Sequence, residues 1–129
     1  MQAIGIDVGG SGCRLAVVDT VTGEVEGDVV RLDHDLETST QDILVALHEA
    51  LDGLPSLPVG LGFPGRVNGS TVQTAPNLRS TWPGTDVAMA LGRPSLVLLN
   101  DADAAAVAEQ RLGAAVGEGG VVLMITVGT

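Results

Sequence analysis

The chain has 129 residues, of which 18 are glycine, and a formal net charge of −10 at pH 7. Its six basic residues are all arginine, and the absence of lysine excludes a Walker A loop, the strand lysine of protein kinases and Schiff-base catalysis. The negative charge argues against a nucleic-acid partner because it repels the phosphate backbone. The aromatic content of 2% argues the same way, because proteins that bind single strands stack bases on aromatic side chains.

The cysteine count and the hydropathy pattern limit the cellular setting. Cys13 is the only cysteine, so the chain can form neither an internal disulfide nor a cysteine-based zinc site. The first residues lack the basic and apolar regions of a signal peptide. No apolar run approaches the about 18 residues that span a bilayer. We therefore expect a cytoplasmic protein without a membrane partner.

The first half of the chain predicts three strands followed by a helix. Apolar runs separated by glycine-containing turns place strands over residues 3–8, 13–19 and 24–32, and the short turns favour an antiparallel meander. Apolar residues at helical spacing then predict a helix that begins after Ser39 and ends at Gly53.

The second half alternates strands with helices. A strand over residues 57–62 is followed by a long loop over 63–83, in which Asn68-Gly69 favours a small hairpin. Four elements are predicted to follow: a helix over 85–91, a strand over 95–99, a helix over 101–115 and a strand over 121–127. The order β-β-β-α-β-α-β-α-β predicts one α/β domain with a mixed sheet and helices on its faces.

A glycine-rich turn follows the first predicted strand. Asp7 ends that strand, and Gly9, Gly10 and Gly12 lie in the turn. Glycines let a backbone approach a phosphate and present N–H donors to it, while the carboxylate favours a metal or water between them. On this segment alone, a hairpin whose amides bond to Asp7 is equally compatible. Arg14 suits either a phosphate contact or a surface ion pair.

Acidic residues also follow the predicted strand at 95–99. The segment Asn100-Asp101-Ala102-Asp103 lies where a strand ends and a helix begins, which is where ligands bind in open α/β sheets. A carboxylate there can accept a proton from a substrate hydroxyl. The alternative is structural, with Asp101 as a helix N-cap and Asp103 interacting with the helix dipole.

Three weaker signals complete the pattern. The long loop contains Gly62-Phe63-Pro64-Gly65 and Ala75-Pro76-Asn77-Leu78, and the Asn77 amide could both donate to and accept from a sugar hydroxyl. Ordinary turn chemistry also accounts for these residues. The last predicted strand ends in Gly128-Thr129, which suits either a second phosphate loop or a plain strand end.

Taken together and in order, these segments resemble the ROK family of sugar kinases and repressors, within the actin-like, ribonuclease-H-like ATPase superfamily. Residues 5–12 resemble its first phosphate motif, and residues 100–105 its catalytic segment. The two loop motifs resemble its sugar-side loops, and residues 126–129 the start of its second phosphate motif. Within the family, the motifs of the polyphosphate glucokinases are most similar to two segments of this chain, Gly9-Gly10-Ser11-Gly12 and Trp82-Pro83-Gly84.

The resemblance implies an actin-like lobe that transfers a phosphoryl group from polyphosphate or ATP to the 6-hydroxyl of glucose or a related hexose. It implies Asp101 as general base and Asp7 as a ligand of Mg²⁺ through water. The implied sugar-binding residues are Gly65, Asn77, Asn100 and Asp101. The implied phosphate-binding residues are Asp7, Gly9, Gly10, Ser11, Gly12, Arg14, Gly128 and Thr129.

The resemblance also concerns what these 129 residues do not contain. The family's second lobe adds sugar ligands and the adenosine site, so residues 1–129 are expected to be an N-terminal lobe that is inactive alone, from a homodimeric protein. Alternatives are a non-catalytic sugar-binding regulatory module of the family and a remnant that binds nothing. Polyphosphate glucokinases usually carry lysine where this chain has Arg14, and the acidic sequence reveals no evident basic track for a polyanion.

Overall fold

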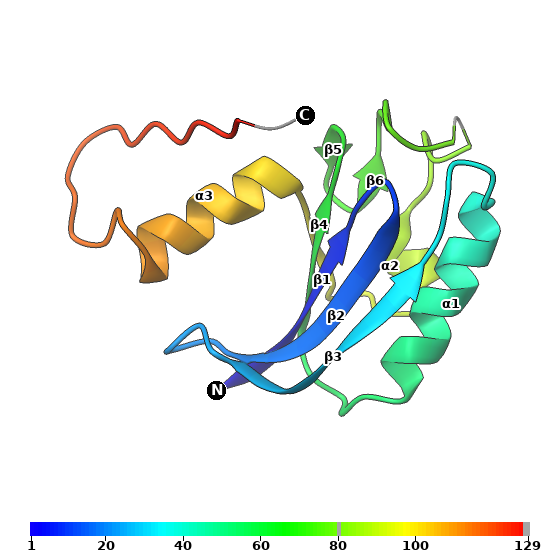
Figure 1. Cartoon of the computed structure of the whole chain (residues 1–129), viewed down its shortest axis with the longest axis horizontal. Helices are drawn as coiled ribbons and strands as arrows, with labels where there is room; N and C mark the ends of the chain where they lie inside the picture. Colours follow the sequence, from blue (N-terminus) through cyan, green and yellow to red (C-terminus); the bar gives the residue numbers. More distant parts are fainter. Residues whose placement is uncertain (80, 128–129) are drawn as a thin grey trace.

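The computed structural model describes residues 1–79 and 81–127, and a five-stranded mixed sheet forms its centre (Figure 1). The strands are β1 (Gln2–Val8), β2 (Gly12–Asp19), β3 (Val25–Asp33), β4 (Val59–Phe63) and β7 (Val97–Asn100). Their spatial order is β3-β2-β1-β4-β7. The first three strands form the predicted antiparallel meander, whereas β1, β4 and β7 are parallel. The carboxyl ends of these three strands therefore meet at one edge of the sheet.

Helices cover the two faces of the sheet unequally. The helices α1 (Thr40–Asp52) and α2 (Val87–Ala90) lie on one side, and α3 (Asp101–Leu112) lies on the other, against β4 and β7 (Figure 1). None of the helices in the described part of the chain is long and apolar enough to cross a membrane. The strands β5 (Val67–Asn68) and β6 (Thr71–Val72) form the predicted hairpin, whose turn uses Gly69 at a φ of +58°.

The core lies between the sheet and α1 because apolar residues alternate along the strands. In β1, Ile4, Ile6 and Val8 are buried against the helix face, so Gly5 and Asp7 project from the opposite face. The same alternation in the other strands and the apolar stripe of α1 complete one cluster around Leu15, Leu47, Leu61, Phe63 and Trp82. Side-chain alternation thus places the Asp7 carboxylate on the less covered face of the sheet.

The boundaries of α1 follow the sequence prediction. Ser39 Oγ accepts a hydrogen bond from the Asp42 amide at 3.0 Å and donates one to the Asp42 carboxylate at 2.7 Å. Gly53 ends the helix, and its amide bonds back to the Glu49 carbonyl at 3.3 Å. The Ser39 cap satisfies an N–H group that the first turn of the helix leaves without an intrahelical acceptor.

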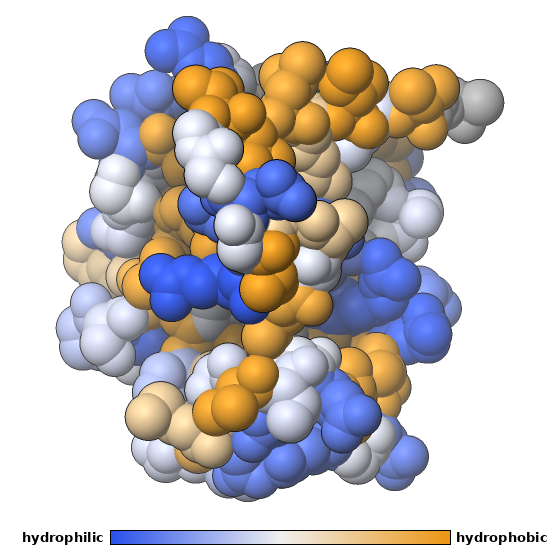
Figure 2. All heavy atoms as spheres, turned by 90° about the vertical axis from the view of Figure 1, so that its left-hand side faces the viewer, coloured by the Kyte–Doolittle hydropathy of each residue, from blue (hydrophilic) through white to orange (hydrophobic). Residues whose placement is uncertain are grey.

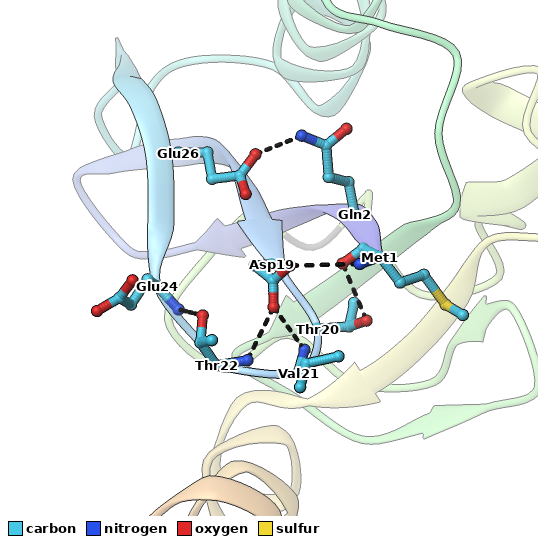
Figure 3. Close-up of polar contacts among 8 residues, drawn as sticks. All are labelled: Met1, Gln2, Asp19, Thr20, Val21, Thr22, Glu24 and Glu26. Carbon is cyan, nitrogen blue, oxygen red and sulfur yellow. Dashed lines mark hydrogen bonds and ion pairs between the residues drawn. The ribbon is translucent and has the colours of Figure 1, made fainter.

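A carboxylate organises the turn between β2 and β3 (Figure 3). Asp19 Oδ1 accepts hydrogen bonds from the amides of Val21 and Thr22, both at 2.8 Å, and Oδ2 contacts the Met1 amino group at 3.3 Å. Because these bonds favour the ionised form, the Thr22 amide above all, they lower the pKa of Asp19 to about 2.

The pairing of β2 with the edge strand β3 is irregular near the middle of the two strands. The register shifts between Leu15 and Val17, and the β3 segment opposite contains Gly27 at a φ of +78°. Side chains other than glycine rarely adopt this conformation, so the glycine permits the bulge. The bulge bends the long strand β3 at the open edge.

The last predicted strand is absent, which corrects the expected element order. Residues 121–127 run past α3 without a strand partner (Figure 1), and α3 ends at Leu112 instead of continuing to residue 115. A strand forms only where a neighbour accepts and donates its backbone hydrogen bonds, and the described residues provide none here. Val121, Leu123 and Ile125 remain exposed, and Figure 2 shows hydrophobic side chains gathered on this side.

Candidate functional site

The strand register brings the two predicted acidic segments to the same edge of the sheet. Asp7 at the end of β1 is aligned with Gly62 of β4. The next residue of β4, Phe63, is aligned with Asn100, which ends β7 immediately before Asp101. Parallel pairing therefore brings Asp7 and Asp101, which are about ninety positions apart in the chain, to the same end of the sheet, with Gly62 between them.

Gly62 of β4 lies close to both acidic segments. A Cβ atom at Gly62 would lie 3.7 Å from Asp101 Cα and 3.8 Å from the Ile6 carbonyl oxygen. Asp7 and Asp101 line one open hollow of about 430 Å³ over the outer face of the sheet, with Arg14 at the same hollow. The two carboxylates can therefore act on one bound molecule.

The turn from β1 to β2 is closed tightly by its glycines. The Gly9 amide bonds to the Gly12 carbonyl at 2.9 Å, and a Cβ at Gly12 would lie 2.8 Å from the Leu32 carbonyl oxygen. Within residues 1–79 and 81–127, the amides of Gly10 and Ser11 donate to no protein acceptor. Unpaired N–H groups in a glycine turn are donors of the kind that bind anions in other proteins, so the structure is compatible with the predicted phosphate site.

The charged groups at this turn are paired in the free protein. Arg14 Nη2 donates to Asp7 Oδ2 at 2.5 Å, and both side chains are about half exposed, so Arg14 does make the ion pair considered from the sequence. Cys13 between the loop and Arg14 is buried. Its burial, with a smaller effect from the Asp7 charge, raises the thiol pKa to about 11, which keeps the sulfur protonated and unreactive.

Asn100 caps α3, which corrects the suggestion that Asp101 is the N-cap. Asn100 Oδ1 accepts from the amides of Ala102 at 3.0 Å and Asp103 at 3.3 Å, while its Nδ2 donates to the Gly65 carbonyl at 2.9 Å. Within residues 1–79 and 81–127, Asp101 accepts one hydrogen bond, from the Ala102 amide at 2.8 Å, and the residue is exposed. Its second carboxylate oxygen therefore has no protein donor among these residues.

The sugar-side residues predicted from the long loop are also drawn to this edge. Gly65 is buried, and a Cβ there would lie 1.9 Å from the Thr74 carbonyl oxygen, so this position requires glycine. Asn77 is exposed, and its carbonyl oxygen would lie 3.8 Å from a Cβ on Gly10, which places its turn beside the glycine loop. Gly128 and Thr129, predicted as phosphate contacts, lie outside the described residues.

The sequence reasoning missed Arg31. In the β2–β3 register it lies directly opposite Arg14, and both line a hollow of about 280 Å³ together with Gly9, Ser11 and Gly12. The alternation within the predicted strand over residues 24–32 could have placed Arg31 on this face, but only the strand pairing reveals its neighbour.

The carboxylates of the site determine which metal ion it could hold. No group of three or more His, Cys, Asp or Glu side chains in residues 1–79 and 81–127 is arranged to hold a metal ion. Mg²⁺ differs from other metals in that it commonly keeps several waters and takes one or two carboxylates plus substrate phosphates. Asp7, half exposed beside the free amides of the loop, has the chemistry of such a ligand.

Comparison with known proteins places the chain in the ROK family. A model of the ROK family matches residues 3–129. The polyphosphate glucokinase of Mycobacterium tuberculosis is 37% identical over 99% of this chain and 50% of its own length. The chain thus spans about half the length of this curated relative.

Solved structures agree with the sequence comparison. The inorganic polyphosphate/ATP-glucomannokinase of Arthrobacter sp. strain KM superposes with a TM-score of 0.79 at 33% identity, over 92% of this chain and 51% of that protein. A glucokinase from Streptomyces griseus, solved with glucose and AMPPNP, gives a TM-score of 0.76 at 28% identity, over 91% of this chain and 38% of that one. The five-stranded sheet is therefore that of an actin-like ATPase lobe, as predicted.

Proposed function

Because the chain belongs to the ROK family, we propose that it is the N-terminal lobe of a glucokinase that uses polyphosphate or ATP. One observation supports this most directly: Asp7 and Asp101 line one hollow, and Asp7 and Arg14 also line the neighbouring hollow at the glycine loop. Phosphoryl transfer needs a base for the attacking sugar hydroxyl, a site for the phosphates and positive charge to neutralise them, all held in fixed geometry. Asp101 can supply the base, the glycine loop the phosphate site, and Arg14 with a metal held by Asp7 the positive charge.

Asp101 acts as the general base in this proposal. Its exposed carboxylate lies at the start of α3, with one oxygen held by the Ala102 amide and the other available to the 6-hydroxyl of glucose. As the hydroxyl oxygen attacks the terminal phosphorus atom of the donor, the bond from that phosphorus to the bridging oxygen breaks and the shortened polyphosphate or ADP leaves. The hydroxyl proton passes to Asp101. The Asn100 amide group retains one N–H after bonding to Gly65, and this N–H is directed to a sugar hydroxyl along with Asn77 and the Gly65 backbone.

The glycine loop receives the donor. The free amides of Gly10 and Ser11 contact phosphate oxygens, and Arg14 moves from Asp7 to the phosphate when the donor binds. Asp7 would hold Mg²⁺ through water. The metal would neutralise part of the negative charge on the transferring group.

Asp101→Asn tests the base assignment, with Asp103→Asn as its matched control. Both variants remove one negative charge from the first turn of α3, but only Asp101 lines the hollow. In the protein extended by the in-frame continuation of its gene, we expect Asp101→Asn to lower kcat by about 10²–10⁴-fold with the fold intact, because a general base contributes that much. Asp103→Asn should turn over glucose almost normally. Near-normal turnover by Asp101→Asn would refute the assignment.

The two-lobe proposal has a separate test. The chain should have no glucokinase activity alone with glucose, Mg²⁺ and either donor, because the relatives are about twice as long. Extended by an in-frame continuation of its gene, the protein should phosphorylate glucose, measured as glucose 6-phosphate formed. Robust turnover by residues 1–129 alone, or a gene without such a continuation, would contradict the proposal.

A further inference from the structure

A cross-strand pair of arginines lies beside the glycine loop. The β2–β3 register sets Arg14 and Arg31 directly opposite each other, and both side chains are exposed on the outer face of the sheet. Directly opposed residues have Cβ atoms about 5 Å apart, and like charges in this position destabilise the strand pair. The arrangement therefore favours an anion that contacts both guanidinium groups.

Only one of the two arginines is neutralised within the protein. Arg14 pairs with Asp7, but Arg31 has no ion pair or side-chain hydrogen bond within residues 1–79 and 81–127. Asp33, two residues further along β3, also lines the hollow without forming such a pair. Two arginines and two aspartates leave this hollow electrically balanced, although the whole chain carries a net charge of −10.

The two arginines lie between the glycine loop and the open edge of the sheet. The hollow of about 280 Å³ is lined by the glycine loop, by Arg14 on β2, and by Arg31 and Asp33 on the edge strand β3. An anion that ends at the glycine loop and extends from β2 toward the open edge would reach Arg14 on β2 and Arg31 opposite it on β3, beside the Asp33 carboxylate.

We propose that Arg31 and Arg14 form a track for the distal phosphates of a linear polyphosphate whose terminal phosphate lies at the glycine loop. This inference rests on the proposed function and names the donor that suits this site. A polyphosphate repeats its charge along the chain at intervals shorter than the strand spacing, so one molecule can contact both arginines. Arginine also bonds to phosphate in a bidentate manner without losing its charge.

Direct binding tests the track on the 129-residue chain itself. Long-chain polyphosphate would be titrated by calorimetry into the parent chain, Arg31→Gln and the matched control Arg111→Gln, at several salt concentrations. Arg111 carries the same charge in the last turn of α3, away from the glycine loop. We expect Arg31→Gln to weaken binding about fivefold and to reduce the salt dependence, because one phosphate contact is lost. Arg111→Gln should bind like the parent.

A second binding experiment compares polyphosphates of different length. Arg31→Gln should have little effect on binding of pyrophosphate, which is too short to extend beyond Arg14, and a growing effect on tripolyphosphate and longer chains. An equal loss in Arg31→Gln and Arg111→Gln would show attraction by overall charge and overturn the proposal. Unchanged binding of long chains by Arg31→Gln would overturn it as well. Circular dichroism on each variant would verify that the sheet is intact.

Turnover separates this inference from the proposed function. In the protein with its in-frame continuation, Arg31→Gln should raise KM for long-chain polyphosphate by a clearly larger factor than KM for ATP. If glucose is phosphorylated but KM for polyphosphate does not change, the track is wrong and the kinase assignment stands. If no donor supports phosphorylation, the kinase assignment fails, and the binding data still decide the role of Arg31.

Discussion

Gly65 illustrates how a single residue can define the geometry of the site. Its backbone carbonyl accepts the Asn100 side chain, and its missing Cβ leaves room for the Thr74 carbonyl on the opposite side of the loop. Both contacts involve backbone atoms, which cannot rotate away as a flexible side chain would. The residue is therefore a structural requirement for the loop whether or not it touches a sugar.

Gly65→Ala should destabilise the protein, whereas Gly60→Ala should not. A Cβ at Gly65 meets backbone atoms at 1.9 Å, and overpacking of this kind lowers the free energy of unfolding by about 1–3 kcal/mol or more. Gly60 lies within β4 with open space around its Cα, so alanine there should raise stability by about 0.5–1 kcal/mol. Urea unfolding of both variants measures the difference. Equal stabilities would contradict the close packing around Gly65.

At the scale of elements, Asn100 connects β7, α3 and the Gly65 loop. Its oxygen caps the helix and its nitrogen holds the loop, so one side chain fixes the start of α3 relative to the Gly65 loop. The two functions use different atoms and can be separated by substitution.

Asn100→Ser should retain the cap and lose the link to the loop, while Asn100→Ala should lose both. A serine hydroxyl can cap a helix but is too short to reach the Gly65 carbonyl, and loss of a cap lowers stability by about 1 kcal/mol. Amide hydrogen exchange should therefore accelerate in residues 65–74 of both variants. In α3 it should accelerate only in Asn100→Ala. Unchanged protection of the loop in both variants would show that the Asn100–Gly65 bond does not hold it.

Prediction from sequence succeeded at this scale where the cause was local. The end signals of α1, Ser39 and Gly53, lie next to the helix they bound, and Asn68-Gly69 determines its own hairpin. Prediction failed where the cause was distant. Residues 121–127 have the composition of a strand but no partner among the described residues, and Arg31 acquires its significance only from its register with Arg14. The helix cap was misassigned by one residue because both Asn and Asp suit the position.

For the molecule as a whole, three aspartates in separate regions connect stability to pH. Hydrogen bonds lower the pKa of Asp19 at the β2–β3 turn, of Asp35 before α1 and of Asp86 at the start of α2. The dominant donors are the Thr22 amide, the Thr38 hydroxyl and the Met89 amide, respectively. Each carboxylate binds its proton more weakly in the folded state, so each stabilises the fold above its ordinary pKa, and this stabilisation disappears as the pH falls through the folded value.

The urea midpoint of the chain should therefore decrease as the pH falls from about 4, the ordinary carboxyl pKa, toward the folded value of about 2 for Asp19. Asp19→Asn should flatten part of this decrease, because an amide oxygen still accepts from Val21 and Thr22 but does not titrate. Unfolding curves at several pH values measure the slope. An identical slope in the parent and the variant would exclude Asp19 as a source of the acid sensitivity.

The bulge in β3 has a consequence for how the protein behaves in a crowded solution. A nine-residue strand at the open edge of a sheet is a template on which other chains can add strands and begin to aggregate. Here the kink at Gly27 interrupts the flat row of backbone groups, and the charges of Glu26, Asp28, Arg31 and Asp33 flank it. The irregular edge thus protects the protein from unwanted strand exchange and leaves the rim of the sheet open to solvent.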